Sequence, residues 1–506
     1  MIVVGAGSSG CALAAHLAVN KKQVCLVEAG PDYGSFSQGR WPKELLDPKV
    51  GPDSHDWHYY EERAGGRKFP KSRAKVMGGC SAHNQCAAIW GLPEDYDSWE
   101  AEGWRYAEIS EFIDRVERAP LGDSVRYRGT HGVVPTRPYG EDELAHWQHF
   151  FLRSAVGSGY PRINDLSEPA PAEGVASFYA NVKAGIRWNS AFSFIDPVRN
   201  SPYLTILDRR LVDRLEINGK SAISIICISK TNRVETLKAK RFVLSAGTYG
   251  SPAILLRSGI GPKKELENLG IATVLDLAGV GKNLHDHPGI DAHYNPSRGG
   301  QEMLEEDLRH NTFFESQVIL RAKSSKCEDN FDLHVLPYQT RTESGEWRFS
   351  IIAFDMTPLS RGSLSLYSKD PNSPPKIEPC LLTDDGDHDL SVLHDALLIA
   401  RRMSQMEPFA SMISGELKPG ADVRSAEGID SYIKENVTNY SHPVGTCKMG
   451  AALEEYSVVG TSARVHGLGN VFVADASIIP RIPRANTNLT CYLIGLKIAT
   501  LMLDES

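Results

Sequence analysis

The sequence predicts an α/β fold in which a Rossmann-like nucleotide-binding domain is combined with an antiparallel-sheet domain. Three observations predict this. The chain begins with an apolar strand, a glycine-rich turn and an apolar helix. Strand-like segments are frequent from Tyr203 to Leu244, and alternating apolar and polar residues recur between about 289 and 430. We expect the nucleotide-binding domain at 1–143, 184–288 and 440–506, and an interleaved substrate-binding domain at 144–183 and 289–439.

The first predicted element is a strand at 2–4, followed by the turn Gly5–Gly10 and a helix through 11–18. The turn has the pattern Gly-x-Gly-x-x-Gly, and a second strand ends at Glu28. Such a turn brings a helix N-terminus to a pyrophosphate, while the carboxylate accepts hydrogen bonds from ribose hydroxyls and repels a 2′-phosphate. A plain strand-turn-helix without a ligand is the alternative. The pattern predicts a dinucleotide site, not one for NADP, built from Gly5, Gly7, Ser8, Ser9, Gly10, Glu28 and Ala29.

The later elements are less regular. The stretch from 30 to 79 is rich in Gly, Pro, Ser and charge, so we expect a long loop or lid. It runs into Gly78-Gly79-Cys80-Ser81-Ala82-His83-Asn84, where glycines let the backbone approach a flat cofactor and the histidine could be a ligand, a base or a covalent tether. A helix started by Pro252 is expected near 251–257, and the last helix is expected to begin at Asn488.

Composition excludes several classes of function. The formal net charge of -8 argues against a nucleic-acid partner. No apolar run reaches the roughly 18 residues of a membrane-spanning helix. The nine cysteines are dispersed, which favours reduced thiols, and with no leader peptide evident we expect a cytoplasmic protein. No metal site is expected, because His285 and His287 lack an evident third ligand.

Four blocks together resemble the glucose-methanol-choline (GMC) oxidoreductases. They are the N-terminal turn with Glu28, residues 74–84, residues 250–261, and the C-terminal pair 442–450 with 470–488. The resemblance covers essentially the whole chain. It implies the FAD-dependent oxidation of a primary alcohol to an aldehyde, or further to the acid, by hydride transfer to flavin N5. It also implies cofactor contacts from Gly78, Gly79, His83, Asn84, Val212, Ala246, Asp475, Ala476, Asn486 and Asn488.

The same resemblance assigns a catalytic pair, His442 and Asn486. An imidazole titrates near neutrality and can take the hydroxyl proton, while an amide can donate to the substrate oxygen. His83 stands where most relatives have an aliphatic residue. The matching histidine of the choline-oxidising members is bonded to the flavin 8α-methyl carbon. His83 is therefore expected to tether the FAD covalently; a histidine packed beside a non-covalent flavin is the alternative.

The substrate is less determined than the reaction. Glu315 matches the cation-binding glutamate of the choline-oxidising members, and Trp57 could supply an aromatic wall around a quaternary ammonium. Three departures reshape the expected pocket. Gln85 replaces a small hydroxyl residue, Tyr440-Ser441 replaces a Val-Tyr order, and Thr357 takes the place of a second histidine. We expect substrate contacts from Glu315, Trp57, Tyr440 and Gln85, to choline or to an aryl, furan, pyridoxine-like or sugar alcohol.

The electron acceptor is equally open at this level. Dioxygen would be reduced to hydrogen peroxide in an oxidase, whereas a dehydrogenase of the same family would use a quinone or a protein carrier. A homodimer is expected only by analogy with the family. Other classes remain as alternatives: a lyase or photoenzyme of the family, or a flavoprotein without catalytic activity.

Overall fold

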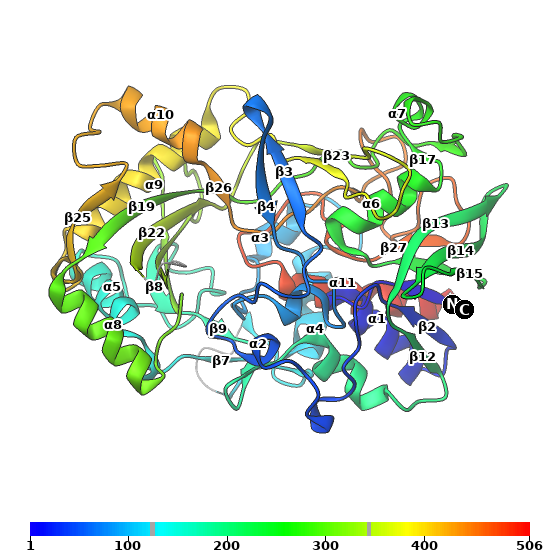
Figure 1. Cartoon of the computed structure of the whole chain (residues 1–506), viewed down its shortest axis with the longest axis horizontal. Coiled ribbons are helices and arrows are strands. Elements are labelled where there is room, and N and C mark those ends of the chain that lie inside the picture. The colour runs from blue at the N-terminus through cyan, green and yellow to red at the C-terminus, as the bar shows by residue number, and fades with distance from the viewer. Residues whose placement is uncertain (122–126, 342–345, 506) are drawn as a thin grey trace.

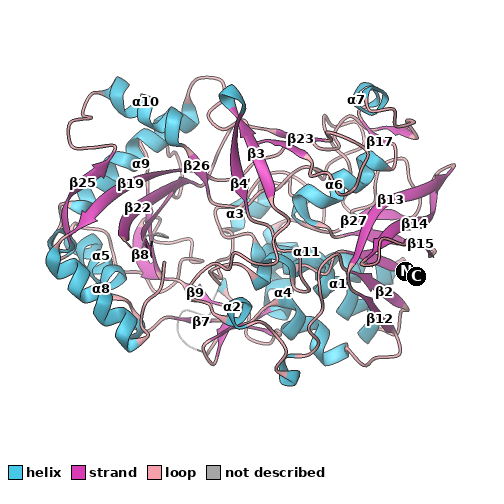
Figure 2. Cartoon of the chain, viewed as in Figure 1, coloured by secondary structure: helices cyan, strands magenta, loops and turns pink. Residues whose placement is uncertain are grey.

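A computed structural model describes residues 1–121, 127–341 and 346–505 of the chain (Figure 1). Within these residues the apolar side chains form two hydrophobic cores. One surrounds a parallel sheet, at the right in Figure 1, and the other surrounds an antiparallel sheet at the left. Figure 2 shows helices packed around both sheets, as expected for an α/β protein.

The parallel sheet has the strand order β12-β2-β1-β16-β27 in the described part of the chain. All neighbouring pairs run parallel, which confirms the Rossmann-like prediction. Helices α1 (Ser8–Val19) and α11 (Asn488–Asp504) pack against each other, and α11 begins at Asn488 as expected. The strands are β12 (Leu204–Leu207), β2 (Val24–Val27), β1 (Ile2–Val4), β16 (Phe242–Leu244) and β27 (Val471–Val473).

The second sheet confirms the predicted antiparallel domain. Its order in the described residues is β25-β19-β22-β21-β20-β8, with β26 paired to β19. Helices α5, α8, α9 and α10 cover its outer side (Figure 1). The bounds are β8 (Gly174–Ser177), β19 (Pro288–Pro296), β20 (Val318–Ala322), β21 (Leu333–Arg341), β22 (Trp347–Asp355), β25 (Ile413–Lys418), β26 (Thr438–Asn439), α5 (His146–Gly157), α8 (Arg298–His310), α9 (His388–Ser404) and α10 (Ala426–Asn436).

The expectation of an irregular stretch from 30 to 79 is wrong in one place. A hairpin forms there from β3 (Tyr59–Arg63) and β4 (Arg67–Lys71). The Arg63 guanidinium lies 3.9 Å from the centroid of the Phe69 ring, and Glu61 pairs with Ile377 of β24 (Lys376–Glu378). The contacts that stabilise this hairpin come from charged side chains and a distant strand. An alternating apolar pattern is therefore not needed, and none in the sequence marks the hairpin.

Strand β24 also pairs with β23 (Ser363–Ser365), a segment expected from its alternation. Leu364, Leu366 and Ile377 pack in the core around the parallel sheet, although they lie between residues 289 and 439. The proposed domain boundaries stay a prediction.

Helix α6 (Gly247–Arg257) begins earlier than expected, so that Pro252 lies inside it rather than at its start. A proline has no backbone N–H and leaves the carbonyl four residues earlier without its helical donor. That carbonyl belongs to Thr248, and the Thr446 hydroxyl donates to it at 2.6 Å. The distant hydroxyl explains why the helix continues through the proline.

The remaining elements connect these layers. None of the helices in the described part of the chain is long and apolar enough to cross a membrane. The connecting elements are α2 (Lys43–Leu46), α3 (Pro93–Asp97), α4 (Tyr106–Val116), α7 (Lys263–Asn268), β5 (Glu117–Arg118), β6 (Val134–Pro135), β7 (Arg137–Pro138), β9 (Tyr179–Ala180), β10 (Val182–Lys183), β11 (Ile186–Arg187), β13 (Arg210–Asn218), β14 (Ser221–Ser229), β15 (Val234–Lys238), β17 (Ile260–Gly261) and β18 (Leu275–Asp276).

Candidate active site

A cavity of about 760 Å³ extends from the carboxyl ends of β1, β2 and β16 to the inner side of the antiparallel sheet. Open α/β sheets bind ligands at the carboxyl ends of their strands. Most of the residues expected to bind cofactor or substrate line this one cavity. They are Gly5, Gly7, Ser8, Ser9, Glu28, Ala29, Trp57, Gly79, His83, Asn84, Gln85, Val212, Ala246, Tyr440, His442, Asp475, Ala476, Asn486 and Asn488.

Gly10, Gly78 and Glu315 are not among the residues that line this cavity, and the contacts expected from them stay predictions. A Cβ on Gly10 would fall 2.0 Å from the Gly5 carbonyl oxygen, so Gly10 permits close packing of the turn. Gly78 has a φ of +97° and donates its N–H to the Ala6 carbonyl. Both glycines shape loops beside the cavity, and Glu315 accepts a hydrogen bond from Gln85, as described below.

The nucleotide end of the cavity is formed by the closest backbone approach of the two glycine loops. A Cβ on Gly79 would lie 2.6 Å from the Gly7 Cα. The Glu28 carboxylate accepts the N–H of Ala6 at 2.8 Å and that of Gly30 at 2.7 Å. Burial raises the pKa of Glu28, and these hydrogen bonds counter the rise. The turn therefore holds the carboxylate in place at the end of β2, where a ribose would be expected.

Two helix N-termini meet at the same end. Ser8 donates its hydroxyl proton to Asn488 Oδ1 at 2.6 Å, which joins the first turns of α1 and α11. Asp475 was expected near the pyrophosphate and ribityl chain. Its carboxylate accepts the Gly247 N–H and the Ser251 and Ser477 hydroxyls, so Asp475 holds the start of α6 against the cavity. Positive helix ends and exposed N–H groups suit an anionic group such as pyrophosphate.

His83 lines the cavity with both ring nitrogens unsatisfied. Among the described residues neither Nδ1 nor Nε2 has a hydrogen-bond partner. Burial lowers its pKa to about 4, so the ring is neutral at physiological pH. A buried polar atom without a partner is costly unless a bound group supplies one. This orphaned ring fits a flat group resting on the loop at 78–84.

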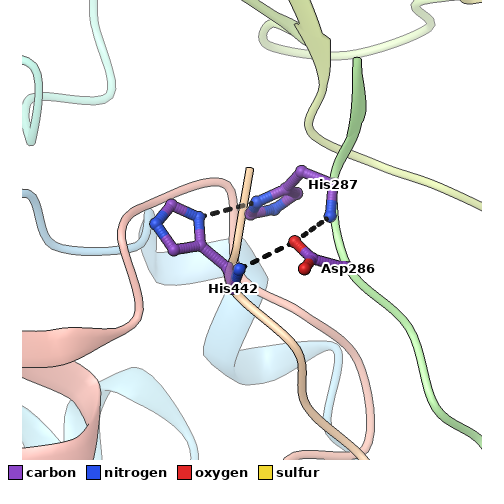
Figure 3. Close-up of side chains that lie close together, drawn as sticks. All are labelled: Asp286, His287 and His442. Atoms are coloured by element: carbon purple, nitrogen blue, oxygen red, sulfur yellow. Dashed lines mark hydrogen bonds between the residues drawn. The ribbon is translucent and has the colours of Figure 1, made fainter. Parts of the chain in front are cut away.

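At the other end of the cavity, His442 hydrogen-bonds through one ring nitrogen to His287 (Figure 3) and through the other to Asn486. His287 Nε2 lies 3.1 Å from the Pro483 carbonyl, which can only accept, so Nε2 carries the proton and Nδ1 is an acceptor. His442 Nδ1, 3.2 Å away, must then donate to His287 Nδ1. The Nε2 of His442 is left unprotonated, and it accepts from Asn486 Nδ2 at 3.1 Å. The hydrogen-bond chain thus presents a free base toward Asn486.

Asp286 hydrogen-bonds to the backbone of both histidines. Its Oδ1 accepts the backbone N–H of His287 and that of His442, each at 2.8 Å (Figure 3). The sequence had suggested no third ligand beside His285 and His287, but the structure groups Asp286, His287 and His442 closely enough to hold an ion. His285 is not part of that group, because its ring bonds the Asn283 carbonyl and the Ile482 N–H.

The environment keeps His442 neutral. Its pKa lies well below the usual value, first because the ring is buried, and then because of His287, Arg73, His334 and Lys71. Tyr440 packs over it, with ring centroids 4.4 Å apart, and stacks on Phe354 at 3.8 Å. His334, Arg73 and Lys71 were not among the expected site residues, and no local motif marks them.

The cation site expected around Glu315 and Trp57 stays a prediction. Gln85 Nε2 donates to Glu315 Oε2 and, at 3.4 Å, to the Tyr338 hydroxyl. Gln85 and Tyr338 line the cavity. Trp57 lines the cavity too, but the Lys75 ammonium lies 4.5 Å from its ring centroid. Sequence reasoning missed Tyr338, which follows Leu336 at the period-two spacing of β21.

Thr357, which takes the place of a second histidine, does not line the cavity. Its N–H and hydroxyl bond Asp355 instead. The described residues place a different histidine nearby: His334 of β21 lies 6.3 Å from Tyr440 between ring centroids. The ring nitrogens of His334 are buried without partners in the described part of the chain.

The fold and cavity define a Rossmann-type oxidoreductase architecture, with a dinucleotide cleft that reaches a second, antiparallel-sheet domain. GMC oxidoreductase family models match residues 1–289 and 358–495, and the chain belongs to the GMC oxidoreductase family. It is 31% identical to choline oxidase of Arthrobacter globiformis, over 99% of this chain and 93% of that protein.

Two further similarities support the assignment to the family. The chain is 30% identical to an oxygen-dependent choline dehydrogenase of Photobacterium profundum, over 100% of this chain and 93% of the relative. The crystal structure of pyridoxine 4-oxidase from Mesorbium loti superimposes with a TM-score of 0.86 at 26% identity, over 99% of this chain and 98% of that one.

Proposed function

We propose that this protein is an FAD-dependent oxidase that converts a primary alcohol to an aldehyde. One observation carries the proposal: an unprotonated His442 Nε2 and the Asn486 amide lie together at the end of a cavity that begins at Glu28. A base and a hydrogen-bond donor at one point are what alcohol deprotonation needs. Membership of the GMC family supports the choice of cofactor and reaction.

The residues that line the cavity fit FAD. Glu28 would hold the ribose, and the α1 N-terminus with Ser8 and Ser9 would face the pyrophosphate. Gly7 and Gly79 line the cavity without side chains, so a flat group could lie against their backbone. His83 would meet the flavin, and Asn488 at the start of α11 would place a positive helix end near it. When bound, FAD supplies the hydride acceptor.

The protein's own groups handle the proton. The substrate hydroxyl would displace the Asn486 amide from His442 Nε2 and give its proton to that nitrogen. The Asn486 N–H would then donate to the alkoxide oxygen. His287, held by the Pro483 carbonyl, accepts from His442 Nδ1 and so keeps the ring in the required tautomer and orientation. The hydrogen on the carbinol carbon leaves as hydride, which balances the two-electron oxidation to the aldehyde.

Dioxygen is proposed as the electron acceptor, with hydrogen peroxide as the product. The support comes from relatives, since those at 30% and 31% identity are described as oxygen-dependent choline dehydrogenase and choline oxidase. A covalent His83–flavin bond is proposed from the orphaned ring nitrogens at the cavity wall and from the resemblance noted above.

One anaerobic experiment tests the reaction. Purified protein is mixed with a panel of primary alcohols, and loss of the flavin's yellow absorbance is followed before air is admitted and peroxide is measured. We expect bleaching with at least one alcohol and a loss of about 10²–10⁴ in kcat/KM for His442→Ala. His131→Ala, at a side chain that is 82% exposed, is the matched control. Full activity of His442→Ala would overturn the assignment of the base.

The tether has a separate test. Protein precipitated with acid should retain its colour in the pellet, whereas His83→Ala should release all of its flavin to the supernatant. Release of the flavin from the wild-type protein would disprove the covalent bond while leaving the alcohol oxidation proposal intact.

A further inference from the structure

The substrate end of the cavity presents a polar pair, Gln85 and Tyr338, and not a bare carboxylate. Both side chains line the cavity, whereas Glu315, to which Gln85 donates, is not among the lining residues. Gln85 comes from the loop after the glycine-rich string and Tyr338 from β21, so the pair joins the two domains.

The hydrogen bonds decide what the pair presents. The Gln85 amide nitrogen donates to Glu315 Oε2 and to the Tyr338 hydroxyl, so its carbonyl Oε1, to which no described residue donates, is the atom left to accept a hydrogen bond. The Tyr338 hydroxyl oxygen is the acceptor of the second Gln85 donation, at 3.4 Å from Nε2. With the Gln85 N–H groups directed at Glu315 and Tyr338, the Gln85 carbonyl oxygen is left as an acceptor, beside the remaining lone pair of the Tyr338 hydroxyl.

A quaternary ammonium finds little support at this end. Oε2 of Glu315 already accepts from Gln85 Nε2 and, at 3.4 Å, from the Gly51 N–H. The indole of Trp57 has the Lys75 ammonium over its ring, and a second cation at that ring would be repelled. A trimethylammonium group also has no N–H to give to the free oxygens.

The neighbouring wall is apolar. Phe178, Ile319 and Leu336 line the cavity, and Leu336 lies on the same face of β21 as Tyr338, about 7 Å away along the strand. Such a wall accommodates an aromatic or aliphatic body, and the oxygens of Gln85 and Tyr338 then select what the far end of that body carries.

We infer that the substrate is a primary alcohol with an apolar body and a hydrogen-bond donor, O–H or N–H, at its far end. Gln85 is the specificity-determining residue; its amide is oriented by hydrogen bonds to Glu315 and Tyr338. The inference rests on the proposed alcohol oxidation and goes beyond it by naming the substrate class. A site built to accept a hydrogen bond discriminates strongly against an analogue that lacks the donor.

The kinetic test uses matched pairs of alcohols. The first pair is 3-hydroxybenzyl and 3-methoxybenzyl alcohol; the second is N,N-dimethylethanolamine, which carries N–H when protonated, and choline, which does not. We expect kcat/KM to favour the donor-bearing member of at least one pair by about 10–100-fold, since one lost hydrogen bond costs about 1–3 kcal/mol. The pair in which the donor-bearing alcohol is favoured shows whether Gln85 accepts from an O–H or from an N–H group.

The substitution Gln85→Met keeps the side-chain length and removes the acceptor. It should bring the ratio within the preferred pair to about threefold or less, while Gln301→Leu, at an exposed position on α8, should leave it unchanged. Choline preferred over dimethylethanolamine, with turnover abolished by Glu315→Gln, would overturn the inference and restore the cation site.

A binding measurement separates this inference from the proposed function. Non-oxidisable 3-methylphenol and 3-methylanisole are titrated into the holoprotein, and the shift of the flavin absorbance is followed. We expect the phenol to bind about 10-fold or more tightly than the ether, and Gln85→Met to remove the difference. Equal binding of the two in the wild-type protein overturns the inference. The absence of bleaching by every alcohol, with this difference intact, overturns the proposed oxidation alone.

Discussion

At the scale of single residues, a carbonyl oxygen sets the protonation of the candidate base. The Pro483 carbonyl requires a proton on His287 Nε2, and that requirement passes through His287 Nδ1 to His442. The consequence is a neutral His442 whose free lone pair lies at Nε2, beside Asn486. Nearby positive charges from Arg73 and Lys71 add to the effect of burial in keeping the pKa of His442 low.

The charge of Lys71 gives a prediction on pH dependence. A base works only when unprotonated, so kcat/KM should be constant through neutral pH and fall only in acid, below the usual histidine pKa. Lys71→Met removes a positive charge near His442, makes protonation easier, and should move the acid limb upward by about 0.5–1 pH unit. The pH profile of kcat/KM measures this.

Lys68→Met on the same strand provides the comparison, because the Lys68 side chain is 58% exposed and its charge is screened. A Lys71→Met profile that coincides with that of Lys68→Met would show that Lys71 does not act on the base.

Gly79 carries the second prediction at this scale. Its φ is +53°, and a Cβ would fall 2.6 Å from the Gly7 Cα, so Gly79→Ala must push the two cofactor loops apart. We expect at least a 10-fold loss of flavin content, read from the ratio of flavin to protein absorbance after gel filtration. Gly39→Ala shares the positive φ, at +64°, but has no atom within 4 Å. Gly39→Ala therefore carries only the backbone strain of a side chain at positive φ, about 1 kcal/mol, and should keep its flavin.

At the scale of elements, α6 depends on a residue almost two hundred positions later. Pro252 deprives the Thr248 carbonyl of its helical donor, and the Thr446 hydroxyl replaces that donor. Both Thr248 and Tyr249 line the cavity, so the repaired turn forms part of the cofactor site. The segment that contains the candidate base His442 is thereby attached to α6.

A double-mutant cycle tests this contact. Thr446→Val should lower the free energy of unfolding by about 1–3 kcal/mol, because a buried carbonyl loses its partner. Pro252→Ala restores a backbone N–H in the helix, so the same Thr446→Val change should then cost less than about 1 kcal/mol. Urea unfolding followed by tryptophan fluorescence measures both. Equal costs in the two backgrounds would mean that Pro252 and Thr446 are independent.

At the scale of the whole molecule, the cavity depends on both sheets. Its nucleotide end is made by loops of the parallel sheet, and its substrate end includes Ile319, Leu336 and Tyr338 of the antiparallel sheet. A ligand that fills such a cavity binds the folded state and stabilises it in proportion to its concentration over Kd.

Flavin removal should therefore lower the unfolding temperature of the protein. For a non-covalent flavin, free FAD at 100 times its Kd stabilises by about 2.7 kcal/mol. A tethered flavin does not dissociate, so the wild-type unfolding temperature should be independent of added FAD, whereas that of His83→Ala should rise with it. Differential scanning fluorimetry over a series of FAD concentrations distinguishes the two. Identical dependence in both proteins would argue against the tether.

Local signals in the sequence predicted the parts of the fold whose cause is local. The strand at Ile2–Val4, the glycine turn and the start of α11 at Asn488 were all predicted, because short-range periodicity and turn chemistry determine them. The hairpin β3–β4 and the true start of α6 were missed. Their stability comes from partners far along the chain, Ile377 for the first and Thr446 for the second.

The candidate site divides in the same way. By itself the sequence determined the family, the dinucleotide turn and the short list that contains His442 and Asn486, since each is carried by a contiguous motif. Only the tertiary structure decided that His287 orients His442, and that Gln85 and Tyr338 line the cavity while Gln85 donates to Glu315. Those residues come from separate loops and strands. Packing of two sheets, not spacing along the chain, fixes which of their atoms meet.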